Sequence, residues 1–195
     1  SDLVCIFVGT GIGGGVVSGG RMLEGCSNTA GELGHTTIVA GGRRCHCSNM
    51  GCLEAYAGGW GIAERAIEAV KGNGIAGRNL LKLAGAVENI TAATVSMAYK
   101  DKDPLAFQLI EETGEYLAAG IVSIVNAFNP RMIILGGGVI EKLIVLIPMI
   151  EQGVRKNALE AAVAPLKIVK AALGDKAAVI GAASLAREIR LLKKK

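Results

Sequence analysis

The sequence predicts an α/β fold. Two continuous apolar segments of strand length, Leu3–Val8 and Met132–Leu135, each run into glycines, and helical patterns fill most of the chain between them. At 195 residues the chain is long enough for one well-cored domain, with room for a second small lobe. The composition is 51% hydrophobic but only 4% aromatic, which indicates an aliphatic core.

The chain enters its first predicted strand, Leu3–Val8, almost at once. A central strand needs neighbours on both sides, so we do not expect residue 1 to be the natural start of a domain. Val16-Val17, the turn Ser18–Gly20 and Arg21–Leu23 then predict a β-hairpin.

Between the strand and the hairpin lies the glycine-rich segment Gly9–Gly15. Gly11, Gly13 and Gly14 would let backbone N–H groups approach an anion, and Thr10 adds a hydroxyl. The segment lacks the Gly-Lys-Ser/Thr of a Walker loop, and a hairpin rather than a Rossmann helix follows it. Glycine spacing alone is equally compatible with phosphate binding and with a hairpin tip that binds nothing.

A loop over residues 28–55 carries the remaining candidate functional residues. Gly31 and Gly34 flank Glu32 and predict a kinked backbone that places Glu32 and His35 in a loop. Taken alone, Glu32 is more typical of an exposed loop carboxylate than of a ligand.

His35 is followed by Cys45, Cys47 and Cys52, a C-x-C-x4-C pattern with a histidine upstream. Three thiolates and one imidazole make a closed tetrahedral set that suits structural zinc and leaves no open position for catalysis. The alternative is a loop of reduced cysteines without metal. We expect the side chain of His46 to point away from the metal, and Cys5 and Cys26 to be packing residues.

Apolar periodicity and capping residues predict five helices in the middle of the chain. They cover Leu53–Ala57, Gly61–Lys71, Asn79–Leu83, a helix capped by Thr91 that runs through Tyr99, and a long helix that starts at Asp103-Pro104 and ends before Asn129-Pro130.

A second glycine motif, Gly136, Gly137 and Gly138, follows the strand Met132–Leu135. A strand that runs into glycine and then a helix is a common nucleotide site, and also simply a tight connection. The pattern then predicts a helix over Glu141–Asn157 that Pro148 bends, a strand over Leu166–Leu173, and a helix over Lys176–Leu192 capped by Asp175.

Charge and cysteine content bound the class of protein. The net charge of +4 comes partly from Lys193–Lys195, which favours a solvated helix end over a nucleic-acid patch. Five cysteines, three of them clustered, favour a metal in a reducing cytosol over a disulfide framework. The most apolar run, Tyr116–Phe128, is too short to span a bilayer. We therefore expect a cytoplasmic protein without membrane contact, and the aliphatic content suggests a homodimer or higher homo-oligomer.

Taken together, Gly-Glu-x-Gly-His at 31–35, the cysteine cluster and Glu54 two residues beyond Cys52 resemble the ROK family of repressors and sugar kinases. The resemblance covers essentially residues 1–195 and implies the actin-like ATPase (ribonuclease H-like) fold of hexokinases, with nucleotide and sugar between two α/β lobes.

The resemblance also assigns roles to residues, with ATP, Mg²⁺ and structural Zn²⁺ as cofactors. The ATP-phosphate motif corresponds to Gly9, Thr10, Gly11, Gly13 and Gly14, and the adenosine-side motif to Gly136, Gly137 and Gly138. Glu32, His35 and Glu54 correspond to sugar-contacting positions, and His35, Cys45, Cys47 and Cys52 to zinc ligands. His35 can serve both, with one ring nitrogen on zinc and the other facing the sugar.

Two departures from the family pattern stand out. The usual Cys-Gly-Cys-Gly reads Cys45-His46-Cys47-Ser48. The family's N-terminal lobe, with its Asp-x-Gly-Gly-Thr motif and its general-base aspartate, has no counterpart, and Asp2 lies at the wrong end of the first strand to replace that base. The chain therefore looks like a C-terminal ROK portion.

The resemblance implies an ATP-dependent, glucokinase-like hexose kinase whose C-terminal portion alone has little activity and which does not bind nucleic acid. The alternative is the sugar-sensing domain of a ROK transcriptional repressor. The intact glycine motif at residues 9–15 favours the kinase, because repressors of the family often have degraded ATP motifs. A third interpretation is a zinc-bound, non-catalytic dimer scaffold.

Overall fold

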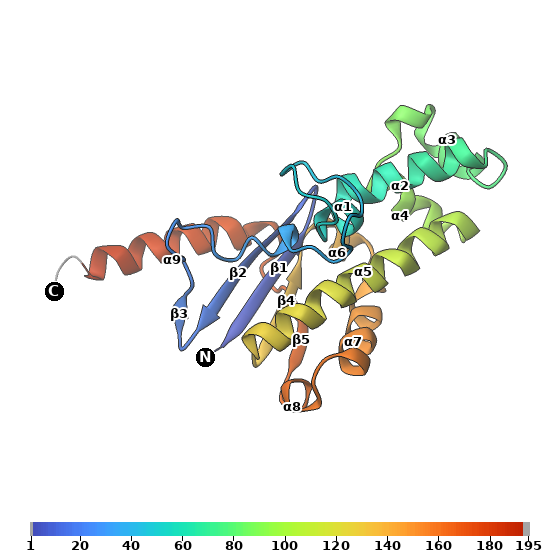
Figure 1. The fold of residues 1–195 in the computed structure, drawn as a ribbon. Helices are drawn as coiled ribbons and strands as arrows, with labels where there is room; N and C mark the ends of the chain where they lie inside the picture. Colours follow the sequence, from blue (N-terminus) through green and yellow to red (C-terminus); the bar gives the residue numbers. More distant parts are fainter. Residues whose placement is uncertain (1, 193–195) are drawn as a thin grey trace.

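The computed structural model describes residues 2–192, apart from the side chains of residues 175, 178 and 188–192 (Figure 1). The expected cap at Asp175 and the Lys193–Lys195 tail lie outside this part. The described residues form a five-stranded mixed sheet covered by helices, in order β3-β2-β1-β4-β5. The strands are β1 (Leu3–Val8), β2 (Ile12–Ser18), β3 (Arg21–Met22), β4 (Met132–Gly136) and β5 (Lys167–Lys170).

The strand β1 is central, as predicted. It pairs antiparallel with β2 and parallel with β4, and β5 extends the parallel side. Only one of its faces is fully buried: Val4, Ile6 and Val8 have no exposed surface, whereas the alternate side chains are half-buried. The helix α5 (Pro104–Phe128) lies across the buried face, with Leu117 and Ile121 fully enclosed (Figure 1).

The helices in the middle of the chain form where the sequence predicts them. They are α1 (Glu54–Ala57), α2 (Gly59–Gly72), α3 (Arg78–Ala84), α4 (Ala92–Lys100) and α5. The hydroxyl of Thr91 accepts a hydrogen bond from the N–H of Thr94 at 3.2 Å and begins α4. The carboxylate of Asp103 accepts from the N–H of Ala106 at 2.9 Å and begins α5 with Pro104 in its first turn.

The C-terminal third corrects three expectations. The predicted helix over 141–157 is two helices, α6 (Gly138–Lys142) and α7 (Leu146–Asn157). The chain breaks at Leu143, which is buried there, and Pro148 lies in the first turn of α7, where a proline causes no bend. A short helix, α8 (Glu160–Val163), went unpredicted. The strand β5 is shorter than predicted and ends at Lys170, the partner of Leu135 in β4. A 3₁₀ turn then leads into α9 (Ala177–Leu192).

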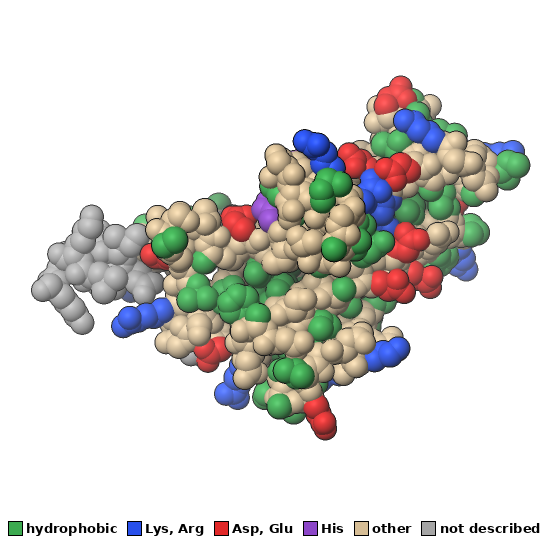
Figure 2. Space-filling model, viewed as in Figure 1, with side chains coloured by type: hydrophobic (Ala, Val, Ile, Leu, Met, Phe, Trp, Pro, Cys, Tyr) green, Lys and Arg blue, Asp and Glu red, His purple; other side chains and the backbone are tan. Residues whose placement is uncertain are grey.

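The long loop between β3 and α1 has little regular structure, with one 3₁₀ turn over Leu33–His35. Cys26 lies in this loop and is exposed, so the expectation that it packs in the interior was wrong. Charged side chains of both signs are interspersed on the face shown in Figure 2, with apolar side chains between them. Across the described residues, none of the helices combines the length and apolarity needed to cross a membrane.

Candidate active site and zinc loop

The turn between β1 and β2 is fastened to the start of α2. Within the turn, the N–H of Gly9 donates to the carbonyl of Gly11 at 2.9 Å. The first two N–H groups of α2, at Gly59 and Trp60, donate to the carbonyls of Gly9 and Thr10 at 2.9 and 3.0 Å. The N–H groups that begin a helix have no partner inside it, so the turn satisfies two of them and is held rigidly.

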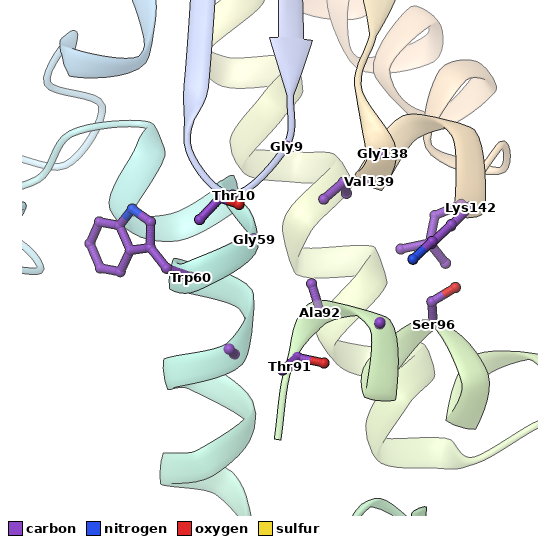
Figure 3. A pocket seen from close by; sticks show the side chains of 13 residues that line it. Gly9, Thr10, Gly59, Trp60, Thr91, Ala92, Ser96, Gly138, Val139 and Lys142 are labelled. Atoms are coloured by element: carbon purple, nitrogen blue, oxygen red, sulfur yellow. The ribbon is translucent and has the colours of Figure 1, made fainter. Parts of the chain in front are cut away.

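A cavity of about 590 Å³ opens beside this turn (Figure 3). Its walls come from the turn, α2, the start of α4 and α6. The residues that line it are Gly9, Thr10, Gly59, Trp60, Ala63, Thr91, Ala92, Ala93, Ser96, Gly138, Val139, Lys142 and Leu143. The volume lies in the range of small-molecule and cofactor sites.

Of the predicted ATP-binding residues, Gly9, Thr10 and Gly138 line the cavity. Gly136 and Gly137 lie just before it, where β4 ends. Gly137 has φ 91°, and a Cβ there would overlap the carbonyl of Val8, so the position requires glycine.

The other predicted phosphate glycines lie elsewhere. Gly13 and Gly14 pair with Phe7 and Ile6 inside β2, and a Cβ at Gly14 would press on the carbonyl of Gly31 and on Leu33. Glycine at position 14 therefore permits the segment that carries Gly31 and Leu33 to pack on β2.

Several lining residues were not singled out from the sequence. Lys142 extends from α6 toward Ser96 on α4 (Figure 3), and its place four residues after the second glycine motif was a usable signal. Ser96 is buried in α4, a helix whose apolar pattern indicates only a structural role. Trp60 is the one tryptophan of the chain. Their roles depend on the packing of α2 against α4, which local sequence does not express.

The carboxylate of Glu54 meets the same turn from the other direction. Its Oε2 accepts from the N–H of Ile12 at 2.7 Å, and its Oε1 accepts from Nε1 of Trp60 at 3.1 Å. A Cβ at Gly11 would overlap Oε2, so glycine at this position leaves room for the carboxylate. Both oxygens of Glu54 are thus held by donors of the chain.

The structure brings the segment Glu32–His35 next to the start of β2. Leu33 and Gly34 are buried, and a Cβ at Gly34 would overlap the carbonyl of Ile12. Glu32 is exposed at the edge of this contact, and His35 is half-buried. The three predicted sugar-contacting residues therefore come from two segments, Glu32–His35 and the start of α1. Both segments contact Ile12.

The four predicted zinc ligands cluster. One ligand atom each from His35, Cys45, Cys47 and Cys52 lies within 4.8 Å of all the others. Nδ1 of His35 is 3.6 Å from Sγ of Cys45, and the sulfurs of Cys47 and Cys52 are also 3.6 Å apart. Tetrahedral zinc with Zn–S bonds of about 2.3 Å places its sulfurs about 3.8 Å apart, so this donor set fits the ion. Nδ1 faces the cysteines, which leaves Nε2 of His35 directed elsewhere.

Without metal, the buried thiol of Cys52 is hard to ionise. Burial, followed by hydrogen bonds with the neighbouring thiols of Cys47 and Cys45, raises its pKa to about 12. Zinc binds the thiolate, so loading the site displaces this proton.

The segment that carries the four predicted zinc ligands, residues 35–52, is called the zinc loop below. Arg43 holds this loop on α2. Its guanidinium donates to Glu68 at 2.7 Å and to Glu64 at 3.3 Å, and its backbone N–H donates to the Tyr56 hydroxyl at 2.8 Å. The hydrogen bond from Arg43 lowers the pKa of the Glu68 carboxyl, so the carboxylate stays charged to a lower pH than an isolated glutamate would. His46 points away from the ligand cluster, as predicted, and its ring stacks on Trp60 with centroids 4.0 Å apart.

A glycine turn, an adjoining cavity and a Cys₃His loop on an α/β sheet together define the class of protein to which this chain belongs. Residues 1–189 match the ROK family, and the chain belongs to it. The fold is the actin-like ATPase type of ROK glucokinases. It superimposes with a TM-score of 0.84 on a ROK family glucokinase from Streptomyces griseus, solved in complex with glucose and AMPPNP. The two are 33% identical, and the match covers 96% of this chain and 61% of that one.

Curated relatives include both kinases and regulators. A glucokinase of Halalkalibacterium halodurans is 34% identical over 191 residues, which are 96% of this chain and 56% of the relative. The DNA-binding transcriptional dual regulator NagC of Escherichia coli K12 is also 34% identical, over 97% of this chain and 45% of its own length. The chain thus spans about half the length of the curated relatives it matches.

Proposed function

We propose that this chain is the part of an ATP-dependent hexose kinase that holds the nucleotide phosphates, the sugar and a structural zinc ion. The observation that carries the proposal is the shared turn at residues 9–12. A cavity of cofactor size opens on Gly9 and Thr10, and the carboxylate of Glu54 is bonded to the N–H of Ile12 at 2.7 Å. A sugar held at Glu54 and a phosphate at the turn would therefore be neighbours.

In this proposal Thr10 and the turn glycines receive the phosphates, Lys142 adds a positive charge to the cavity, and Gly136–Gly138 border the adenosine. Bound Mg²⁺ would neutralise charge on the transferring phosphoryl group. Glu32, His35 and Glu54 receive sugar hydroxyls and act by positioning.

The transfer also needs a base for the sugar hydroxyl. Among the described residues, none that lines the cavity is an aspartate. The carboxylate of Asp2 accepts from the N–H of Gly19 at 2.7 Å, at the hairpin turn on the opposite end of β2. We therefore expect the chain alone to bind its ligands but to turn over slowly.

Calorimetric titration of the 195-residue chain with glucose and with AMPPNP tests this function. We expect both to bind, and Glu54→Gln to lose glucose binding while it keeps AMPPNP. An assay with ATP, Mg²⁺ and a panel of hexoses should give little or no sugar phosphate. Failure of glucose and every other hexose to bind would refute the sugar site, and rapid turnover would refute the need for an external base.

Similarity to NagC supports a second candidate, the sugar-sensing domain of a transcriptional regulator. The same titrations separate the two. A kinase portion binds both the hexose and AMPPNP, whereas sugar binding without measurable affinity for AMPPNP would favour the regulator.

The zinc ion is proposed to be structural, because three thiolates and one imidazole fill a tetrahedral shell. Replacing one ligand, as in Cys47→Ser, should release the metal and destabilise the protein by about 2 kcal/mol or more. Elemental analysis and urea unfolding measure both effects. Cys26→Ser is the matched control, because Cys26 is exposed and outside the ligand cluster. A full zinc content in Cys47→Ser, or none in the unmodified chain, would contradict the assignment.

We place the protein in the cytoplasm, where reduced thiols are available to the metal. Its partners in this proposal are a hexose, ATP and further copies of the same chain, without a membrane or, in the kinase, nucleic acid.

A further inference from the structure

Trp60 joins three parts of the site that are separate in sequence. Its backbone N–H donates to the carbonyl of Thr10 in the turn at 3.0 Å. Its indole N–H donates to Glu54 at 3.1 Å. One face of its ring lies 4.0 Å from the imidazole of His46, with the two planes 20° apart.

The hydrogen bond from Trp60 determines how Glu54 is presented. The N–H of Ile12 holds Oε2 alone, and a carboxylate with one anchored oxygen can still rotate about its terminal torsion. The indole donor fixes Oε1 as well, so the plane of the carboxylate is defined before any ligand arrives. Each oxygen keeps a free lone pair that can accept a hydroxyl.

The stack with His46 connects Trp60 to the zinc loop. His46 lies between two zinc ligands in sequence, so the fold of the metal loop fixes the position of its ring. His46 is otherwise exposed, whereas Trp60 is half-buried on the rigid start of α2. In Figure 3 the indole points away from Lys142 and Ser96, although Trp60 itself lines the cavity.

We propose that Trp60 is a positioning residue whose indole N–H orients the Glu54 carboxylate and whose ring, stacked on His46, couples that carboxylate to the zinc loop. The sugar part of this inference rests on the proposed function, and the metal part does not. A residue that only packs would be replaceable by phenylalanine without a change in ligand binding.

Two variants separate the two contacts. Trp60→Phe keeps a ring for His46 but removes the donor to Glu54, and His46→Ala removes the stack but keeps the donor. By glucose calorimetry, we expect Trp60→Phe to weaken binding about tenfold, the size of one lost hydrogen bond to a charged group. Its zinc content and its rate of zinc release to a chelator should be unchanged. His46→Ala should release zinc several-fold faster.

Trp60 also reports on the metal directly, because it is the single tryptophan of the chain. Removing zinc with EDTA should shift its fluorescence to longer wavelength as His46 leaves the indole. His46→Ala should show the shifted emission from the start and respond little to EDTA. Circular dichroism confirms that the chain stays folded in each state.

The outcomes distinguish this inference from the proposed function. If the unmodified chain binds glucose and Trp60→Phe binds it equally well, the positioning role is wrong and the sugar site stands. If neither binds glucose, the sugar site is wrong, and the EDTA experiment still decides the coupling. An equal EDTA response in the unmodified chain and in His46→Ala would overturn the coupling.

Discussion

At the scale of single residues, Gly11 shows how a side chain elsewhere can require a glycine. Its φ is not in the left-handed region, so the backbone alone would accept another residue. The space that a Cβ would need is occupied by the carboxylate of Glu54. Glycine at position 11 is therefore required by the Glu54 carboxylate and not by the conformation of the turn.

Gly11→Ala should consequently reduce glucose affinity at least tenfold while leaving stability within about 1 kcal/mol, because the displaced group is the end of a flexible side chain. Calorimetry and urea unfolding measure the two effects. Gly15→Ala is the control, since its added Cβ meets nothing within 4 Å. Equal glucose affinity in Gly11→Ala and Gly15→Ala would disprove the crowding argument.

The cluster of four possible zinc ligands could be predicted from sequence because its chemistry is local: four donor residues of the right type lie within eighteen positions. The contacts of Trp60 could not. An indole reaches Glu54 and His46 only after α1, α2 and the zinc loop have packed together, and no spacing rule expresses that packing.

At the scale of elements, the long helix α5 reaches the site through Gly120. A Cβ on Gly120 would lie 2.6 Å from Leu53, which is fully buried and directly precedes Glu54. The helix can approach α1 closely because this position has no side chain. The packing of α5 on Leu53 thereby helps to fix the position of the Glu54 backbone.

Gly120→Ala should destabilise the protein by about 1–2 kcal/mol, because overpacking against Leu53 exceeds the gain in helix propensity. Glucose affinity should fall as Leu53 moves. Gly114→Ala on the same helix is the control, because its added Cβ would come no closer than 3.0 Å to Met149, against 2.6 Å to Leu53 at Gly120. Urea unfolding should show Gly114→Ala unchanged or more stable. A more stable Gly120→Ala would show that Leu53 has room.

The elements predicted best were those with caps or strict periodicity, such as α4 after Thr91 and α5 after Asp103. The break between α6 and α7 was missed because Val139, Leu143 and Leu146 keep helical spacing across it. An apolar pattern shows which residues are buried. It cannot distinguish a loop that buries Leu143 from a continuous helix that buries the same residue.

At the scale of the whole molecule, apolar side chains lie exposed on the last helix. On α9, Val179 is 73% exposed, and Ile180 and Leu185 are about as open as typical surface residues at 41% and 40%. Exposed apolar side chains on one helix favour association. The other face of β1 is also only half-buried.

We therefore expect the isolated chain to self-associate with rising concentration, measured by light scattering against its 20.0 kDa monomer mass. Val179→Lys should shift association to higher concentration, because it replaces the most exposed of these three apolar side chains with a charge. Val39→Lys, at another exposed valine, in the zinc loop, is the control. Equal association of both variants would place the contact elsewhere.

The attachment of the turn to α2 has an electrostatic consequence. All described peptide bonds are trans, so each carbonyl points opposite to the N–H of the same peptide unit. The carbonyls of Gly9 and Thr10 point at the start of α2. The amide hydrogens of Thr10 and Gly11 must then point away from that helix. Two peptide dipoles are thus oriented before any ligand binds. Their negative ends are neutralised by α2 and their positive ends point outward, which is the polarity that an anion requires.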